Sequence, residues 1–138
     1  MMKKVEIDEL EYIGYYTYED EPFTGIAYEL HYNGQVMSEV AMVGGVEDGL
    51  QTEYYDTGQI KSKLMMHNNW IHGYCVEWYE KGQIKMKSLI EYGIIVWQKQ
   101  YGENGNLEYH FLIESTSDDY KRLQDFREKK GWSIAADE

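Results

Sequence analysis

The fold is decided by the stretch Gly49-Leu-Gln-Thr-Glu-Tyr-Tyr-Asp-Thr-Gly58-Gln-Ile-Lys-Ser62, because related stretches lie on either side of it. One of them runs from Gly25 through Gly34-Gln-Val, and the other runs from Gly73 through Gly82-Gln-Ile-Lys. Both glycines of the stretch therefore recur at a spacing of 24 residues. Self-similarity at a fixed period is the sequence signature of a repeat architecture.

Each copy contains two turns. Between Tyr55 and Gln59 lie Asp56, Thr57 and Gly58, which predict a three-residue loop ending in glycine. A type I turn closed by a left-handed residue fits this loop, because glycine adopts that conformation without a steric penalty. The second turn is predicted at three equivalent positions that tolerate positive φ, namely Gly45, Asn69 and Gly93. Two turns per repeat leave two strands, so the repeat unit is a β-hairpin and the fold class is mainly β, an extended antiparallel meander.

The hairpin turn also predicts the register of its two strands. It places Tyr54 opposite Ile60. It also places Glu53 opposite Lys61, and the next repeat reproduces this pair with Glu77 and Lys85. Strand alternation then predicts one dry and one wet face. The dry face collects Ile26, Tyr28, Leu30, Val36, Val40, Met42, Leu50, Tyr54, Ile60, Leu64, Met66, Tyr74, Val76, Trp78, Ile84, Ile90, Leu107, Tyr109, Phe111 and Ile113. The wet face collects Glu29, His31, Glu53, Tyr55, Lys61, Lys63, Glu77, Tyr79, Lys85 and Lys87.

The length of 138 residues suits a single domain, which divides into three segments. Residues 1–22 form an acidic N-terminal strand segment, in which Tyr15–Tyr18 is expected to pair with the strand after Phe23. Residues 23–114 hold the repeats. The fourth copy diverges, because Val96 replaces its first glycine and its loop is expected to gain a residue.

The third segment, residues 115–138, predicts a helix and a tail. Thr116 or Ser117 is a suitable N-cap, and Gly131 stands where a helix-ending glycine belongs, so the helix should span Asp118–Lys130. An apolar stripe supports this helix and consists of Tyr120, Leu123 and Phe126. The helix is expected to cover the end of the sheet, with Trp132 and Ile134 packed behind it; binding a partner is the alternative role.

Composition narrows the possible partners. The chain has 25 Asp+Glu against 13 Lys+Arg, a formal net charge of −12. Direct binding to nucleic acid or to anionic lipid is therefore disfavoured, and a basic protein partner is favoured. Solubility alone would also account for the charge. Cys75 stands alone in the sequence, and neither a signal peptide nor an apolar run long enough to cross a bilayer is evident, which favours the cytoplasm.

The hairpins resemble the MORN-repeat variant of YwqK-type antitoxins, a resemblance that spans residues 15–113. It rests on the pattern Gly-x8-Gly-Gln-Ile/Val and on Trp70-Ile-His-Gly73 before the third hairpin. Pro22-Phe-Thr-Gly25 resembles the opening of bacterial members. Tyr92-Gly-Ile-Ile95 and Asn104-Gly-Asn-Leu107 resemble their closing repeat. The resemblance implies an antitoxin or immunity protein that binds and neutralises a cognate protein toxin, often a nuclease.

Signals of catalysis are weak. The histidines are scattered without a metal-binding spacing, and the repeat counterparts of Cys75 are Ala27 and Gln51, neither of them a nucleophile. His31 stands at the repeat position of Tyr55, which favours a surface role. No phosphate-binding loop is present. We therefore expect no catalytic residue, no cofactor and no metal.

The sequence thus predicts a non-enzymatic immunity protein that covers the active site of a basic bacterial toxin. Because interface hot spots favour Tyr and Trp, its aromatic anchors are predicted to be Tyr55, Tyr79 and Trp97. Its charged contacts are predicted to be Glu29, Glu53 and Glu77, which recur one repeat apart. The acidic N-terminal segment or the C-terminal helix could serve instead. The alternative functions are a structural MORN-like scaffold or a lipid-associated module, and an enzyme or enzyme accessory domain, which would need a deep polar pocket.

Overall fold

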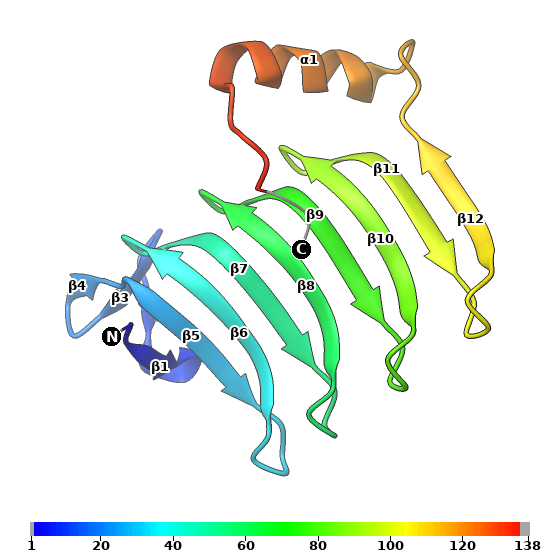
Figure 1. Ribbon diagram of the computed structural model, residues 1–138. Coiled ribbons are helices and arrows are strands. Elements are labelled where there is room, and N and C mark those ends of the chain that lie inside the picture. Colours follow the sequence, from blue (N-terminus) through cyan, green and yellow to red (C-terminus); the bar gives the residue numbers. More distant parts are fainter. Residues whose placement is uncertain (1, 136–138) are drawn as a thin grey trace.

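The computed structural model describes residues 2–135 and shows a long meander sheet followed by a helix (Figure 1). Within these residues, the large sheet has nine strands in the order β1-β5-β6-β7-β8-β9-β10-β11-β12. The strands of this sheet are β1 (Lys4–Glu6), β5 (Gly25–Leu30), β6 (Val36–Val43), β7 (Val46–Tyr54), β8 (Ile60–His67), β9 (Trp70–Trp78), β10 (Ile84–Glu91), β11 (Ile94–Tyr101) and β12 (Leu107–Leu112). The mainly β, antiparallel meander predicted from the repeats is confirmed.

The two turns of each repeat take the predicted conformations. In the first turn Gly58 has a φ of 92°, and its N–H donates to the Tyr55 carbonyl at 2.9 Å. The divergent fourth copy keeps this three-residue loop, closed by a hydrogen bond from the Gly102 N–H to the Asn106 carbonyl, so the predicted extra loop residue is wrong. The second turns have two successive residues with positive φ, a type I′ pattern that matches the strand twist. These pairs are Gly44-Gly45, Asn68-Asn69 and Tyr92-Gly93.

A one-residue bulge follows the loop in the hairpins of the large sheet. Tyr54 pairs with Ile60 as predicted, but Glu53 pairs with Ser62, which leaves Lys61 as the extra residue on β8. The predicted Glu53–Lys61 pair is therefore wrong. The Glu77–Lys85 pair is wrong for the same reason, because Glu77 pairs with Met86. The equivalent extra residues in the other hairpins are Met37, Lys85 and Glu108.

The bulge changes which residues share a face, because one extra residue inverts the alternation beyond it. The predicted dry and wet faces are therefore wrong for most of each second strand. Leu64 lies opposite Gln51 and shares a face with Glu53, whereas Lys63 lies opposite Thr52 and shares a face with Tyr54. We call the face that carries Glu29, Glu53 and Glu77 the glutamate face. We call the other face, which carries Tyr74 and Trp97, the Trp97 face.

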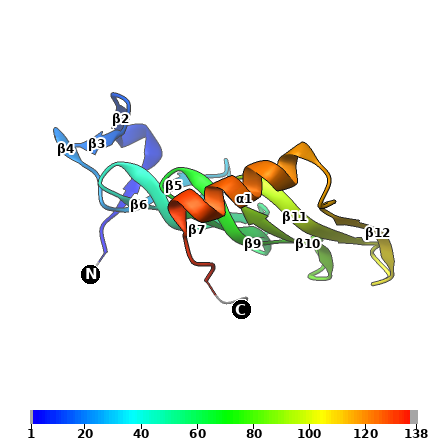
Figure 2. The same cartoon turned by 90° about the horizontal axis from the view of Figure 1, so that it is seen from above.

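The N-terminal segment adds a second, smaller sheet of β2 (Glu11–Tyr12), β3 (Tyr16–Tyr18) and β4 (Glu21–Pro22), preceded by the 3-10 helix η1 (Ile7–Glu9). Figure 2 shows these strands standing off one side of the large sheet. The predicted pairing of Tyr15–Tyr18 with the strand after Phe23 is wrong, because β1 pairs with β5 in parallel and β3 pairs with β2 and β4. Val5 and Phe23 pack against residues of β5 and β6 in the first apolar core.

The helix α1 (Asp118–Lys130) has the predicted bounds. The Ser117 hydroxyl accepts a hydrogen bond from the Tyr120 N–H, and Gly131 ends the helix with a φ of 61°. Its apolar stripe, with Leu123 fully buried, packs on Tyr92 and Ile94 in the second apolar core. The helix crosses the strand ends near the Tyr92 turn, while the outermost strand β12 remains exposed along its length (Figure 1). The end of the predicted tail, residues 136–138, lies outside the described residues.

Polar contacts fix the helix, and Trp132 just after it, to the sheet. Arg127 donates two hydrogen bonds to the carboxylate of Glu91, at 2.9 and 2.6 Å. His72 Nδ1 accepts the Tyr92 N–H at 2.9 Å, so its proton is on Nε2, which faces the Trp132 carbonyl at 3.4 Å. Trp132 packs beside His72 and Tyr92, which confirms its predicted place behind the helix.

Candidate binding surface

Three predicted charged residues line up in one row on the glutamate face. The cross-strand register runs from Glu29 through Ser38 to Glu53, and then through Ser62 to Glu77. Successive glutamates are two strands apart, about 10 Å. All three are half-buried. Among the ion pairs of residues 2–135 none uses these carboxylates, so the row keeps its negative charge available.

Tyr55 and Tyr79 link neighbouring repeats. The Tyr55 hydroxyl donates to the Trp78 carbonyl at 2.7 Å, and the Tyr79 hydroxyl donates to the Tyr101 carbonyl at 2.8 Å. His31 makes the equivalent contact, because its Nε2 lies 2.9 Å from the Tyr54 carbonyl. These side chains therefore stabilise the fold by joining each hairpin to the next one.

The surroundings of Tyr55 place it next to the glutamate row. Burial raises the pKa of the Tyr55 hydroxyl, and the negative charges of Glu80 and Glu77 raise it further. The ammonium group of Lys61 lies 5.8 Å from the centre of the Tyr55 ring. The structure thus brings Tyr55 together with Glu77, although its hydroxyl is already engaged within the fold.

Trp97 does not join this group. It lies in register with Leu89 and Leu112, and its ring centre is 6.3 Å from that of Tyr74. Since Tyr74 and Glu77 are an odd number of residues apart in a regular part of β9, their side chains point to opposite faces. The predicted site residues are therefore divided between the two faces of the sheet.

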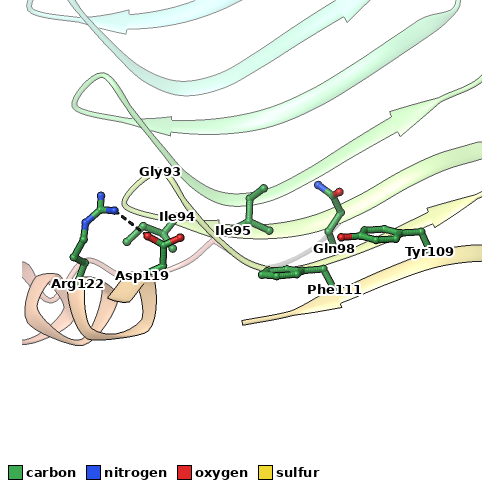
Figure 3. Close-up of a pocket in the computed structure, with 8 residues that line it drawn as sticks. All are labelled: Gly93, Ile94, Ile95, Gln98, Tyr109, Phe111, Asp119 and Arg122. Carbon is green, nitrogen blue, oxygen red and sulfur yellow. Dashed lines mark hydrogen bonds and ion pairs between the residues drawn. The ribbon is translucent and has the colours of Figure 1, made fainter. Parts of the chain in front are cut away.

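A groove continues the glutamate face beneath the helix (Figure 3). It has a volume of about 390 Å³ and lies between the first half of α1 and strands β11 and β12. Its lining residues are Gly93, Ile94, Ile95, Gln98, Tyr109, Phe111, Asp119 and Arg122. The register joins it to the glutamate row, because Glu77 pairs with Met86, Met86 with Gln100, and Gln100 with Tyr109.

Tyr109 and Phe111 are candidate binding residues that the sequence did not indicate. Strand alternation assigned both to a dry face, yet Tyr109 is 49% and Phe111 38% exposed. Exposed, adjacent aromatic side chains in a groove are typical interface anchors. Their exposure could have been predicted from their position on the outermost strand, because an edge strand has a neighbouring strand on one side alone.

Cys75 lies beside the glutamate row but is not a reactive thiol. It is buried in register with Ser88 and Leu64. Burial raises its pKa, and the negative charges of Glu77 and Glu53 raise it further, against a smaller opposing effect of Ser88. A thiol held protonated in this way is a poor nucleophile. Within residues 2–135, no group of three or more His, Cys, Asp or Glu side chains is arranged to hold a metal ion.

Comparison with protein-family models supports a scaffold of MORN-type repeats. Residues 47–68, which form the β7–β8 hairpin, match the family model described as MORN repeat variant. A comparison with curated protein sequences gives no match.

No helix in the described part of the chain has the length and apolar character needed to span a membrane.

Two solved structures are similar at low scores. The crystal structure of TarM aligns with a TM-score of 0.42 at 10% identity, over 67% of this chain and 18% of that one. The crystal structure of accessory secretory protein 1, 2 and 3 in Streptococcus pneumoniae aligns with a TM-score of 0.38 at 15% identity, over 82% of this chain and 20% of that one. This chain therefore spans at most a fifth of the length of either.

Proposed function

We propose that this protein is a non-enzymatic inhibitor that binds a basic protein partner on the glutamate face. The observation that carries the proposal is the unpaired row of Glu29, Glu53 and Glu77. Because the bulges carry Lys63 and Lys87 to the Trp97 face, and no ion pair of residues 2–135 engages the three carboxylates, a cationic partner would meet negative charge that the fold itself does not neutralise. Acidic complementarity of this kind speeds association and excludes wrong partners.

The groove supplies the apolar part of the interface. Tyr109 and Phe111 extend the row toward helix α1 and offer aromatic area that a partner side chain can cover. A row of charge beside an aromatic pocket matches the usual anatomy of protein interfaces, in which a few aromatic anchors dominate the affinity.

The finer proposal is that the partner is a bacterial toxin such as a nuclease, and that binding occludes its active site. Its support is the resemblance of the hairpins to those of YwqK-type antitoxins, together with the MORN repeat variant at residues 47–68. A nuclease binds phosphates through basic residues, so an acidic surface can occupy the same groove. We place the protein in the cytoplasm, where a buried free thiol such as Cys75 remains reduced.

The test is a pull-down of the tagged protein from its native cells, with the product of the neighbouring upstream gene included. A stoichiometric basic partner, toxic alone and harmless together with this protein, is the expected result. Recovery of membranes without a protein partner would overturn the proposal and favour the structural or lipid-associated scaffold.

Variants then test the binding face. The pair E53Q/E77Q should weaken capture of the partner, and Y109A/F111A should weaken it further. The matched control is D125N/E128Q on exposed positions of α1, which changes the net charge equally. Equal weakening of partner capture by the control would show that capture depends on the net charge of the protein and not on the glutamate row.

A further inference from the structure

The Trp97 face carries a row of positive charge that the proposed function does not use. The register runs from Thr52 to Lys63 and Val76, and then to Lys87, Lys99 and His110. Lys87 and Lys99 are direct cross-strand neighbours, as are Lys99 and His110. We call Lys63, Lys87 and Lys99 the cationic row.

This row is unexpected on two grounds. Like charges directly opposite each other destabilise a sheet. Moreover, acids outnumber Lys and Arg by 25 to 13 in the sequence, so acidic neighbours would be easy to supply. Among the ion pairs of residues 2–135 none involves Lys63, Lys87 or Lys99.

The surrounding rows contain no acid to neutralise it. On the Trp97 face, one neighbouring row consists of Leu50, Met65, Tyr74, Leu89, Trp97 and Leu112. The row on the other side consists of Tyr54, Ile60, Trp78, Ile84, Tyr101 and Leu107. The acid nearest along the cationic row, Glu39, is already engaged by Lys4 at 3.2 Å and by the Tyr54 hydroxyl at 3.0 Å.

The cationic row also borders an apolar hollow. A hollow of about 250 Å³ lies over β5 to β8, and its polar lining comes from Lys63, Thr52 and Glu39, the carboxylate that Lys4 engages. Its apolar lining comes from Ile26, Ala41, Leu50, Tyr54 and Ile60. Trp97 is half-buried, and Leu112 is 68% exposed at the other end of the face. The face thus combines unneutralised positive charge with accessible apolar area.

We propose that the Trp97 face is a second binding surface, which takes an acidic amphipathic helix of a partner protein lying across the strands. Charge complementarity with the cationic row selects the acidic stripe of the helix, and the row of Leu89, Trp97 and Leu112 takes its apolar stripe. This surface is independent of the glutamate face and of the inhibitor function.

The spacings fit a helix. Neighbouring strands place side chains of one row about 4.8 Å apart, and side chains three or four residues apart on a helix lie about 5–6 Å apart. The cationic and apolar rows are two residues apart along each strand, about 7 Å, which lies within the width of one helix of about 10 Å.

Two other polyanions fit less well. Nucleic acid and anionic membranes are large, and a net charge of −12 repels them as a whole. Neither would cover the apolar row next to the lysines in the way that a helix with two stripes would. A short acidic segment contacts the lysines of the cationic row directly, whereas salt screens its repulsion by the more distant negative charges of the protein.

The test uses a fluorescein-labelled model helix with Glu and Leu on adjacent stripes, and a second peptide in which every Glu is Lys. Fluorescence anisotropy should show binding of the acidic peptide alone, weakening as salt rises. The variant K87Q/K99Q should weaken this binding by roughly tenfold. The control K121Q/K129Q removes the same charge from exposed positions of α1 and should leave binding within about twofold.

Three results would overturn the proposal. They are failure of the acidic peptide to bind, equal binding of both peptides, and equal loss in the two lysine variants. Vesicles containing anionic lipid, and a single-stranded oligonucleotide, are tested in parallel. Binding of either one without binding of the peptide would assign the face to that polyanion instead. Because the toxin pull-down depends on the glutamate face, K87Q/K99Q should still capture the toxin.

Discussion

The Tyr55 hydroxyl donates a 2.7 Å hydrogen bond to the Trp78 carbonyl, which belongs to the following hairpin. Tyr79 repeats the bond to Tyr101, and His31 makes its counterpart to Tyr54. A side chain at one repeat position thus joins each hairpin to the next. This link explains why tyrosine recurs at that position better than a role as a partner anchor does.

Replacing Tyr55 by Phe should therefore lower stability and spare partner binding. The variant loses one hydrogen bond, which contributes about 1 kcal/mol to the free energy of unfolding. Urea unfolding measures the change, and Tyr32→Phe is the control because the Tyr32 side chain is fully exposed. Equal stability of the two variants would contradict the structural role of Tyr55.

Arg127→Ala should loosen helix α1. It leaves the Glu91 carboxylate, whose side chain is 9% exposed, without its partner, which costs about 1–3 kcal/mol because the Arg127 side chain is itself 43% exposed. Arg122→Ala removes an exposed pair with Asp119 and should cost less than about 1 kcal/mol. Hydrogen exchange of α1 reports the loosening, and similar exchange in both variants would argue against it.

His72 should make stability fall in mild acid. Burial lowers its pKa in the folded protein, against smaller opposing effects of the Trp132 carbonyl and Glu91. The unfolded chain therefore takes up a proton first, so stability is full above about pH 6.5 and falls as the pH decreases toward the folded pKa. Unfolding midpoints between pH 7.5 and 5 measure this.

The assignment to His72 has its own control. His72→Gln should flatten the pH profile, because it removes the side chain whose pKa burial lowers. Direct NMR titration of the His72 ring gives the same information if the variant does not fold. A ring that titrates above about 6.5 would contradict the predicted direction.

Lys99→Glu should stabilise the free protein. It replaces the repulsive cross-strand contact with Lys87 by an attractive one, which contributes about 0.2–1 kcal/mol. Thermal unfolding measures the gain. The same variant should bind the acidic model helix less well, so a gain in stability with unchanged binding would separate the cationic row from any ligand.

The sequence predicted the repeats, both turns of each hairpin and the helix, because these depend on local signals. Gly58 and Gly131 each indicate in the sequence a position where the backbone takes a positive φ. Tyr92 could not be predicted in the same way, since a bulky residue at a φ of 53° is held there by its contacts with Trp132 and His72. Those contacts come from segments far apart in the chain.

Which residues share a face was predicted correctly on the first strand of each hairpin and wrongly on the second strand beyond its bulge. An extra residue such as Lys61 leaves the alternation of Leu64 and Met66 intact, so nothing in either strand alone reveals the bulge. The row of Glu29, Glu53 and Glu77 was predicted because these residues lie on equivalent first strands. The division of Trp97 from that row, and the exposure of Tyr109 and Phe111, depend on pairings across the whole sheet.

The bulge at Lys61 also means that the number of residues in the second strand, and not the amino-acid composition, decides which face of the sheet each charged side chain occupies. The second and third units each deliver a glutamate, Glu53 or Glu77, to one side and a lysine, Lys63 or Lys87, to the other. Duplicating a unit would lengthen two opposite strips at once while adding little net charge. Deleting the single bulged residue would merge acids and bases on one side, and the sheet would lose its two-sided character without a change in the number of its acids.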